Sequence, residues 1–380
     1  MRFIHTSDLH IGKTIESWDL LEDTEHVLKQ LIDSALSNKV NCVLISGDIF
    51  DRSLPSEDAV KVYDWFLGEL TGHGIKVIAI AGNHDSGIRV SANAELLART
   101  GLYYVAGEVQ PSLKKVTLND EYGPVDFYLC PYFKPVQVAN LLKKENSRDY
   151  TDDLAFQDLL GNTSIDPTHR NVILAHLFAA GYAYDKDGSD LSYSNVAGLE
   201  NVAVNRFDAF DYVALGHIHR PQKLTRETLR YSGSLLKYKI SEVKGPDRSF
   251  CLVDMGPKGD EIKVQVIPVK PLYPVIEISD TFDNLIQRSK DDNDFVYIHL
   301  LDTQPKTNAK NTLSGVFSRI LHIDYPNIKS EGDVESIKVD NKTPMELVEE
   351  FYRIRKGEEL SDEDRKLIEK IFEEIKEEDR

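Results

Sequence analysis

Residues 40–52, VNCVLISGDIFDR, decide the fold, because an apolar run ends there in a Gly-Asp pair followed by a turn. The run Val43-Leu44-Ile45 predicts a strand buried on both faces. Similar short runs lie on either side of it and alternate with segments of helical periodicity, as in the helix predicted around residues 27–35 and the strand at residues 77–80. This β-α-β pattern predicts an α/β fold whose sheet is largely parallel and is covered by helices, the second of which starts at the cap Ser56.

Two further patterns extend the predicted sheets. Alternation of apolar and polar residues predicts hairpin strands between about residues 105 and 131, and a closing antiparallel pair at residues 250–254 and 262–267.

Composition limits the classes of protein that the chain can belong to. Of its 380 residues, 41% are hydrophobic and 28% are charged, so a large core can form. The net charge of −18 excludes a global basic field for nucleic acid, so any attraction to DNA must be local. The three cysteines form no CxxC pair, and no segment approaches the roughly 18 apolar residues of a membrane span. We expect a soluble, reduced, cytoplasmic protein.

Proline positions suggest where the first domain ends. The segment IPVKPLYP at residues 267–274 predicts a linker after a first domain of residues 1–268. Residues 269–340 fit a small β-α-β-α-β domain, with a helix expected around residues 313–320. Residues 341–380 carry helix-start signals at Thr343 and Ser361, which predict a charged helix-loop-helix. The second helix has an apolar stripe of Leu367, Ile368, Ile371, Phe372 and Ile375.

Five short segments share one layout, in which an apolar run ends abruptly in side chains that bind metals. These segments are Asp8-Leu9-His10, Gly47-Asp48, Gly82-Asn83-His84-Asp85, Ala175-His176 and Gly216-His217-Ile218-His219. Open α/β sheets place their sites at strand ends. Because a spacing of two residues sends side chains to the same side of a strand, each Asp-x-His or His-x-His pair can converge on one site.

The donor types indicate which ions such a site holds. Imidazole, carboxylate and amide ligands suit manganese, iron or zinc better than a calcium cage or a thiolate site. The donors are too many for one ion but suit two ions that share a bridging carboxylate. Two dications outweigh the charges of Asp8, Asp48 and a bridging hydroxide, so the site would be cationic and would suit a phosphate ester. The sequence therefore predicts a two-metal hydrolase.

The ordered series DLH, GDIFD, GNHDS, AH and GHIH resembles the calcineurin-like metallophosphoesterases. Within that superfamily, MRFIHTSDLHIGK, IAGNHDS, FDYVALGHIHRPQ and RYSGSLLKY resemble the SbcD family of bacterial nuclease subunits, over about residues 1–255. This resemblance implies a four-layer α+β sandwich for residues 1–268 and a capping domain at residues 269–340 that shapes DNA access. It also implies that residues 341–380 dock onto the base of the coiled coil of an SbcC-type ATPase.

The same resemblance assigns roles to individual residues. It implies one metal position formed by Asp8, His10, Asp48 and His219. It implies a second formed by Asp48, Asn83, His176 and His217, with Asp48 as the bridge. His84 would not bind metal but would approach the scissile phosphate and help the leaving oxygen depart, and the carboxylate of Asp51 would orient it.

Several cations follow the motif segments or lie on predicted loops, and they are candidates for contacts with DNA phosphates. They are Arg52, Arg89, Lys134, Lys237 and Lys239. None of them is expected to be catalytic.

Together these expectations describe a manganese-dependent DNA nuclease that acts as a 3′ to 5′ exonuclease on duplex DNA and as an endonuclease on single strands and hairpins. By resemblance it would be a homodimer that works with an SbcC-type ATPase in DNA repair. Two alternatives stay open. One is another metallophosphoesterase, such as a phosphodiesterase or a protein phosphatase, because GDIFDR partly matches a phosphatase motif. The other is a noncatalytic scaffold that links the ATPase to DNA.

Overall fold

The computed structural model describes residues 1–144, 150–180, 201–288, 293–328, 344–356, 359–361 and 364–368. The chain divides into two compact units, one of residues 1–277 with 292–297 and the other of residues 278–291 with 298–380. The boundary lies within β17 (Val275–Asp280), a few residues beyond the predicted linker. In the described part of the chain, no helix is both long and apolar enough to cross a membrane.

The first sheet of the larger unit contains six strands, in the order β16, β15, β1, β4, β5 and β6. Their bounds are β1 (Arg2–Thr6), β4 (Cys42–Ser46), β5 (Lys76–Ile80), β6 (Tyr103–Ala106), β15 (Ser249–Asp254) and β16 (Lys263–Pro268). The strands β1, β4, β5 and β6 are parallel, whereas β15 and β16 form an antiparallel pair next to β1. Both the parallel opening and the closing antiparallel pair confirm the sequence prediction.

The second sheet also contains six strands, in the order β13, β14, β12, β9, β8 and β7. Their bounds are β7 (Lys114–Asp120), β8 (Gly123–Cys130), β9 (Arg170–His176), β12 (Tyr212–Gly216), β13 (Gln222–Lys223) and β14 (Leu229–Tyr231). The predicted hairpin is the antiparallel pair of β7 and β8, while β8, β9, β12 and β14 are parallel neighbours.

The two sheets pack face to face around a hydrophobic core. In β9, Val172 and Leu174 belong to the core between the sheets, together with Phe3 of β1. The alternate residues Ile173 and Ala175 belong to a second core on the other face of the sheet. Because both faces of β9 are buried, its sequence is a continuous apolar run rather than an alternating one.

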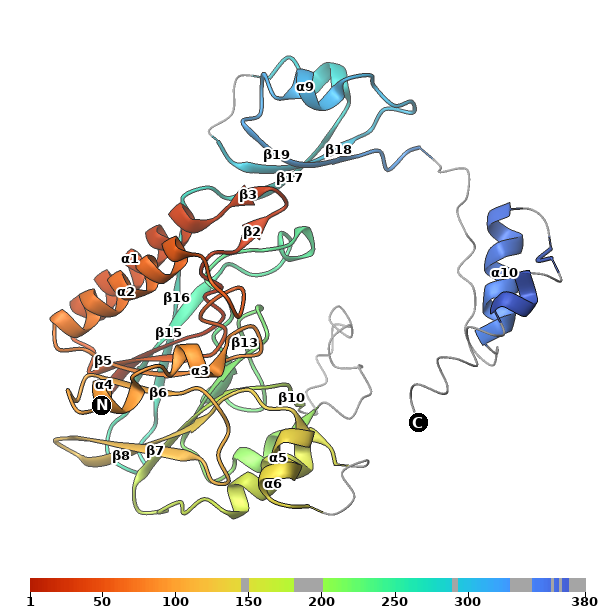
Figure 1. Cartoon of the computed structure of the whole chain (residues 1–380). Coiled ribbons are helices and arrows are strands. Elements are labelled where there is room, and N and C mark those ends of the chain that lie inside the picture. The colour runs from red at the N-terminus through yellow and green to blue at the C-terminus, as the bar shows by residue number, and fades with distance from the viewer. Residues whose placement is uncertain are drawn as a thin grey trace. The chain divides into compact units, whose positions relative to one another are not determined.

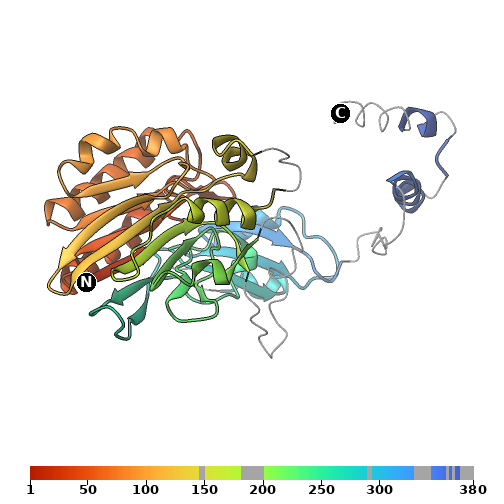
Figure 2. The ribbon, with the colours of Figure 1, turned by 90° about the horizontal axis from the view of Figure 1, so that it is seen from below.

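Helices complete a four-layer sandwich. In Figure 1 the long helices α1 (Leu21–Ser37) and α2 (Glu57–Gly72) lie beside the first sheet, and α5 (Pro135–Leu141) and α6 (Asp152–Gly161) lie beside the second. The same layers can be followed in Figure 2. Helix α2 begins at the predicted cap Ser56, whose Oγ accepts a hydrogen bond from the Ala59 amide at 3.2 Å. The expected α/β class with a four-layer sandwich is confirmed.

Shorter elements connect these layers. They are β2 (Thr14–Ile15), β3 (Trp18–Asp19), α3 (Gly87–Val90), α4 (Ala94–Ala98), β10 (Ala179–Ala180), β11 (Val202–Ala203) and the 3₁₀ turns η2 (Val204–Phe207) and η3 (Ile240–Glu242).

A three-stranded sheet of β17, β18 (Phe295–Leu300) and β19 (Arg319–Asp324) follows, with α8 (Phe282–Leu285) and α9 (Ala309–Leu313). The helix predicted around residues 313–320 was wrong, because α9 ends at Leu313 and β19 begins at Arg319. A turn at residues 314–316, which contains Gly315, separates them. Apolar spacing alone does not locate a turn that ends a helix, because the spacing can continue across it.

The C-terminal region contains α10 (Pro344–Lys356) and a helical stretch at residues 364–368. As the start signal predicted, the Ser361 Oγ accepts a hydrogen bond from the Asp364 amide at 3.1 Å. The predicted cap Thr343 and the apolar positions Ile371, Phe372 and Ile375 lie outside the described residues. The division of the chain at residues 268 and 340 stays a prediction.

Candidate metal centre

All five predicted ligand segments begin where a strand of one of the two facing sheets ends. Three of them follow β1, β4 and β5 of the first sheet, and the other two include the last residues of β9 and β12 of the second. Backbone hydrogen bonds join neighbouring segments, since the Asp8 amide donates to the Gly47 carbonyl and the His10 amide to the Asp48 carbonyl, each at 3.0 Å. The parallel strands therefore bring residues from distant parts of the sequence to one end of the sandwich.

Four of the predicted ligands have a backbone conformation that is unusual for residues other than glycine. Their φ angles are positive, at 51° for Asp8, 42° for His10, 50° for Asp48 and 97° for His217. Each such residue costs about 1 to 3 kcal/mol, and this strain persists only where the surrounding structure imposes it. The strained turns direct these side chains toward one place.

Two glycines allow the segments to approach one another. Gly47 has φ of 90°, and a Cβ there would lie 2.3 Å from Nδ1 of His176. A Cβ on Gly82 would lie 2.1 Å from Oδ1 of Asp48. No other residue fits either position without displacing a predicted ligand.

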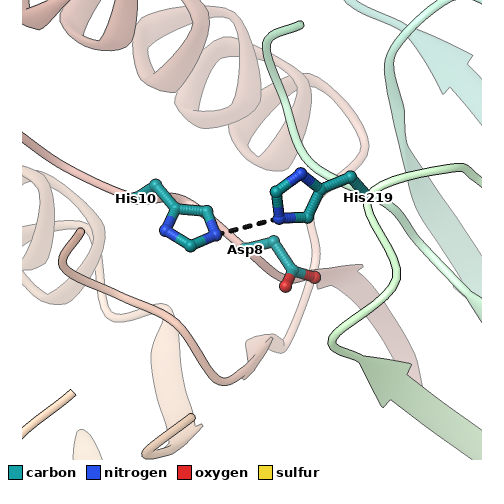
Figure 3. A group of neighbouring side chains, drawn as sticks. All are labelled: Asp8, His10 and His219. Atoms are coloured by element: carbon teal, nitrogen blue, oxygen red, sulfur yellow. Dashed lines mark hydrogen bonds between the residues drawn. The ribbon is translucent and has the colours of Figure 1, made fainter. Parts of the chain in front are cut away.

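Asp8, His10 and His219 form the first group of facing donors (Figure 3). Nε2 of His10 lies 3.0 Å from Nε2 of His219, and the potential ligand atoms of all three residues lie within 4.8 Å of one another. Asp8 is completely buried, and its carboxylate accepts hydrogen bonds from Ser7 Oγ at 2.5 Å and from the His217 amide at 3.1 Å. These bonds fix the position of the carboxylate.

Asp48 lies between this group and a second one. Its Oδ2 is 3.6 Å from Nε2 of His10 and 3.4 Å from Nε2 of His176, while its Oδ1 accepts the His84 amide at 2.9 Å. Burial alone would raise the pKa of Asp48, but the charge of His176 and its hydrogen bond lower that pKa overall. An ionised carboxylate in contact with both groups has the geometry expected of a bridge.

His176, Asn83 and His217 form the second group. The Oδ1 of Asn83 lies 3.1 Å from Nε2 of His176 and 2.9 Å from Nδ1 of His217. Nδ1 of His176 faces the Ser46 carbonyl at 2.8 Å. Because a carbonyl can only accept, Nδ1 carries the proton and Nε2 faces the other donors.

Electrostatics favour a cation at this point. Burial by itself lowers the pKa of His176, yet the carboxylate of Asp48 raises that pKa to about 9. Burial and the neighbouring His176 lower the pKa of His217 to about 3. Positive charge is therefore stabilised beside Asp48 but not at His217. A metal ion bound there would take the place of the proton on His176.

The donor set fits divalent metal ions. Nε2 of His10 and Nε2 of His219 face each other, as ligands of a common ion would. The three cysteines are buried in β4, β8 and β15, so no thiolate reaches the donors. Carboxylate, imidazole and amide donors around a shared Asp48 suit two borderline ions.

His84 lies at the edge of the cluster and is exposed. Its ring packs edge-on against His10, with 4.8 Å between ring centroids, and its Nδ1 donates to the main-chain carbonyl of Asp51 at 2.9 Å. The carboxylate of Asp51 instead lies 2.5 Å from Lys13 Nζ and 3.5 Å from Nδ1 of His10. The expected contact between His84 and Asp51 is thus made by the backbone of Asp51 and not by its carboxylate.

Two acidic residues support the ligands although neither of them was assigned a role from the sequence. Asp85 accepts the amides of Ile49, Phe50 and Gly82 at 2.9 to 3.0 Å, and so joins the segments that carry Asp48 and Asn83. Glu242 accepts Nδ1 of His219 at 3.1 Å. Asp85 stands within the GNHDS motif and could have been noticed, whereas no sequence signal marks Glu242.

The candidate DNA contacts lie on separate elements. Arg52 follows the β4 segment and its side chain is 77% exposed. Arg89 is in α3, and Lys134 precedes α5; both are exposed. Lys239 precedes η3 and is exposed, whereas Nζ of Lys237 donates to the Val243 carbonyl at 2.8 Å. Their contact with DNA stays a prediction.

The fold and this centre define the class of the protein as a metal-dependent phosphoester hydrolase with its ligands at the strand ends of a two-sheet sandwich. Comparison with known families agrees. The chain belongs to the calcineurin-like phosphoesterases, because the model described as "Calcineurin-like phosphoesterase" matches residues 1–221. This match confirms the superfamily that the motif series indicated.

A second family model, SbcD_C, described as "Type 5 capsule protein repressor C-terminal domain", matches residues 271–356. The two models together confirm the predicted resemblance to the SbcD family. Among solved structures, a dimetal phosphatase from Danio rerio is 13% identical, with a TM-score of 0.40, over 70% of this chain and 96% of that one.

Proposed function

We propose that the protein is a manganese-dependent DNA nuclease, the subunit of an SbcCD-type repair complex that cleaves phosphodiesters. Its expected actions are 3′ to 5′ exonuclease cleavage of duplex DNA and endonuclease cleavage of single strands and hairpins. The observation that carries the proposal is the convergence of seven predicted ligands, with Asp48 among them as the shared one, in a chain that also matches the SbcD_C family. Iron or zinc would also suit these donors.

The local charge makes a DNA substrate compatible with the acidic chain. Asp8 and Asp48 are the carboxylates among the predicted ligands, and the other five ligands are one amide and four imidazoles, which are neutral when they bind a metal. When bound, two divalent ions would supply excess positive charge, stabilise charge on the phosphate and lower the pKa of a water molecule. A phosphodiester would thus be attracted at the site although the surface is acidic.

His84 would act as the general acid. It is exposed beside the donors, and the Asp51 carbonyl fixes its Nδ1 proton and therefore the direction of its ring. A protonated imidazole has a second N–H at Nε2, which would give its proton to the departing oxygen. The carboxylate of Asp51, paired with Lys13, would stabilise the position of His10.

The remaining parts of the chain would direct the substrate and the partner. We assign DNA access to the capping region of residues 269–340, and docking of an SbcC-type ATPase to residues 341–380. Helix α10 supports the docking role, because its sequence combines a charged surface with Leu347, Val348 and the half-exposed Phe351. A homodimer completes the proposed complex.

A cleavage assay tests the proposal. End-labelled duplex and hairpin DNA are incubated with the full chain and manganese, with and without the ATPase partner and with chelator. We expect chelator-sensitive cleavage of DNA, with phosphopeptide and small diester substrates turned over far more slowly. Preferred turnover of either small substrate would favour another phosphoesterase, and an absence of cleavage together with near-zero metal content would favour a scaffold.

A further inference from the structure

Both carboxylate oxygens of Glu242 are engaged around His219. Oε1 accepts Nδ1 of His219 at 3.1 Å, while Oε2 accepts the Tyr238 amide at 2.8 Å and Nη2 of Arg248 at 2.7 Å. Arg248 also donates from Nη1 to the carbonyl of His219 at 2.6 Å. The Glu242–Arg248 pair thus holds His219 by its side chain and by its backbone.

This contact determines which nitrogen of His219 is available to a metal. An ionised carboxylate only accepts hydrogen bonds, so Nδ1 of His219 must carry the proton. Nε2 is then left with its lone pair, and it faces Nε2 of His10 beside Asp8 (Figure 3). A carboxylate in this position also increases the basicity of an imidazole ligand.

The second group of donors has no equivalent support at His176. There, Nδ1 donates to the neutral carbonyl of Ser46 at 2.8 Å. Among the predicted imidazole ligands, all of which are described, the only other one with a carboxylate at its Nδ1 is His10, where Asp51 lies at 3.5 Å, so this carboxylate also belongs to the first group. Negative charge behind the imidazole ligands is therefore concentrated on the side of the first group.

The Glu242–Arg248 pair is also costly to bury. The side chains of Glu242 and Arg248 are 16% and 6% exposed, and Nε of Arg248 is buried without a hydrogen-bond partner. A buried ion pair gives little net stability compared with apolar packing, so stability alone does not account for it. The contacts of the pair with His219 give a reason for burying it.

We propose that Glu242, held by Arg248, is a positioning residue that fixes His219 as an Nε2 ligand and makes the position of Asp8, His10 and His219 the tighter of the two metal positions. The proposal rests on the metal-dependent function proposed above and names the residue that makes the two positions unequal.

Titration of the metal-free full chain with manganese, followed by calorimetry, tests the proposal. Glu242→Gln removes the charge and should weaken the tighter binding step by about 10- to 100-fold while the other step changes by less than about twofold. The matched control is Glu227→Gln, because Glu227 is 56% exposed and pairs with Lys223. In an Asn83→Ala background, which disables the second position, the same loss should appear in the remaining step. Equal affinities for Glu242→Gln and the native chain would overturn the proposal.

Two further measurements separate positioning from folding. Imidazole nitrogen resonances of the metal-free protein should show Nδ1 of His219 protonated and Nε2 unprotonated, and the opposite tautomer would exclude the positioning role.

If Glu242→Gln lowers the folded fraction in urea, Arg248→Lys is used, because it retains a cation beside Glu242 but loses a bond to His219. It should weaken the same step by a smaller factor, and unchanged affinity would count against the proposal. DNA cleavage by the native chain is measured in parallel. Failure of the proposed nuclease function can then be distinguished from failure of the positioning role of Glu242.

Discussion

Nε2 of His10 lies 3.0 Å from Nε2 of His219, although 209 positions separate the two residues in the sequence. His10 follows β1 of one sheet, and His219 follows β12 of the facing sheet. Two such nitrogens aimed at each other in a buried site are stable when a proton or a metal ion lies between them. This relationship supports a metal centre that exists only in the folded chain.

Asp48→Asn should remove the bridge between the two metal positions. Loss of its charge is expected to lower DNA cleavage by at least about 100-fold, equivalent to about 3 kcal/mol of transition-state stabilisation. Metal content, measured by elemental analysis, should fall in the same variant. Asp64→Asn is the control, because Asp64 is exposed in α2. Full activity of Asp48→Asn with normal metal content would contradict the assignment.

His84→Ala should separate chemistry from metal binding. Because His84 would donate a proton without binding metal, turnover is expected to fall by about 10²- to 10⁴-fold while both ions are retained. Cleavage rates and elemental analysis are compared for the same preparations. If the metal content falls as far as the rate does, His84 is a ligand and the proposed role is wrong.

Gly82→Ala should disturb the centre through a steric clash. The new Cβ would lie 2.1 Å from Oδ1 of Asp48, and such overpacking costs about 1 to 3 kcal/mol of the free energy of unfolding. Manganese affinity should fall as well. Gly68→Ala serves as the control, because nothing lies within 4 Å of its added Cβ in α2, and it should stabilise the protein by about 0.5 to 1 kcal/mol. Urea denaturation measures the free energy of unfolding, and calorimetry measures the manganese affinity. If Gly82→Ala and Gly68→Ala have the same stability and the same affinity, the clash is refuted.

Asp120 should make stability depend on pH under acidic conditions. Burial raises its pKa, but the hydrogen bonds from Arg170, at 2.5 and 3.0 Å, lower that pKa overall. A carboxylate whose pKa is depressed by folding stabilises the protein above the unfolded pKa of about 3.9, and this contribution is lost as the pH falls below it.

The variant Asp120→Asn should therefore be less stable than the native chain by about 3 kcal/mol at pH 7, because it leaves Arg170 buried without its anion. The difference should shrink between pH 5 and 3. Denaturation curves at several pH values measure it, with the exposed Asp58→Asn as control. If the difference in the free energy of unfolding stays constant with pH, the ionisation of Asp120 is not coupled to folding.

Removal of the residues after 340 should abolish binding of the SbcC-type ATPase and leave simple manganese-dependent cleavage unchanged, because every predicted ligand precedes that point. Copurification of the truncated chain with the ATPase would disprove the docking role. Cleavage of a short duplex by the same preparation shows whether the catalytic unit is intact.

Local patterns made much of the fold predictable. The buried strands β4, β5, β9 and β12 and the helix beginning at Ser56 follow from apolar runs and a capping residue, which are properties of neighbouring positions. The helix expected at residues 313–320 failed because a turn at residues 314–316 ends α9, while the apolar spacing continues across that turn into β19.

By itself, the sequence determined the ligand segments, because each is a short motif at the end of a predictable strand. Only the tertiary structure decided what supports them. Glu242 reaches His219 through a turn that no motif marks, and Asp51 contacts His84 through its carbonyl and not its carboxylate. Such contacts depend on the positions of atoms brought together by the two facing sheets, and neither residue type nor spacing along the chain encodes those positions.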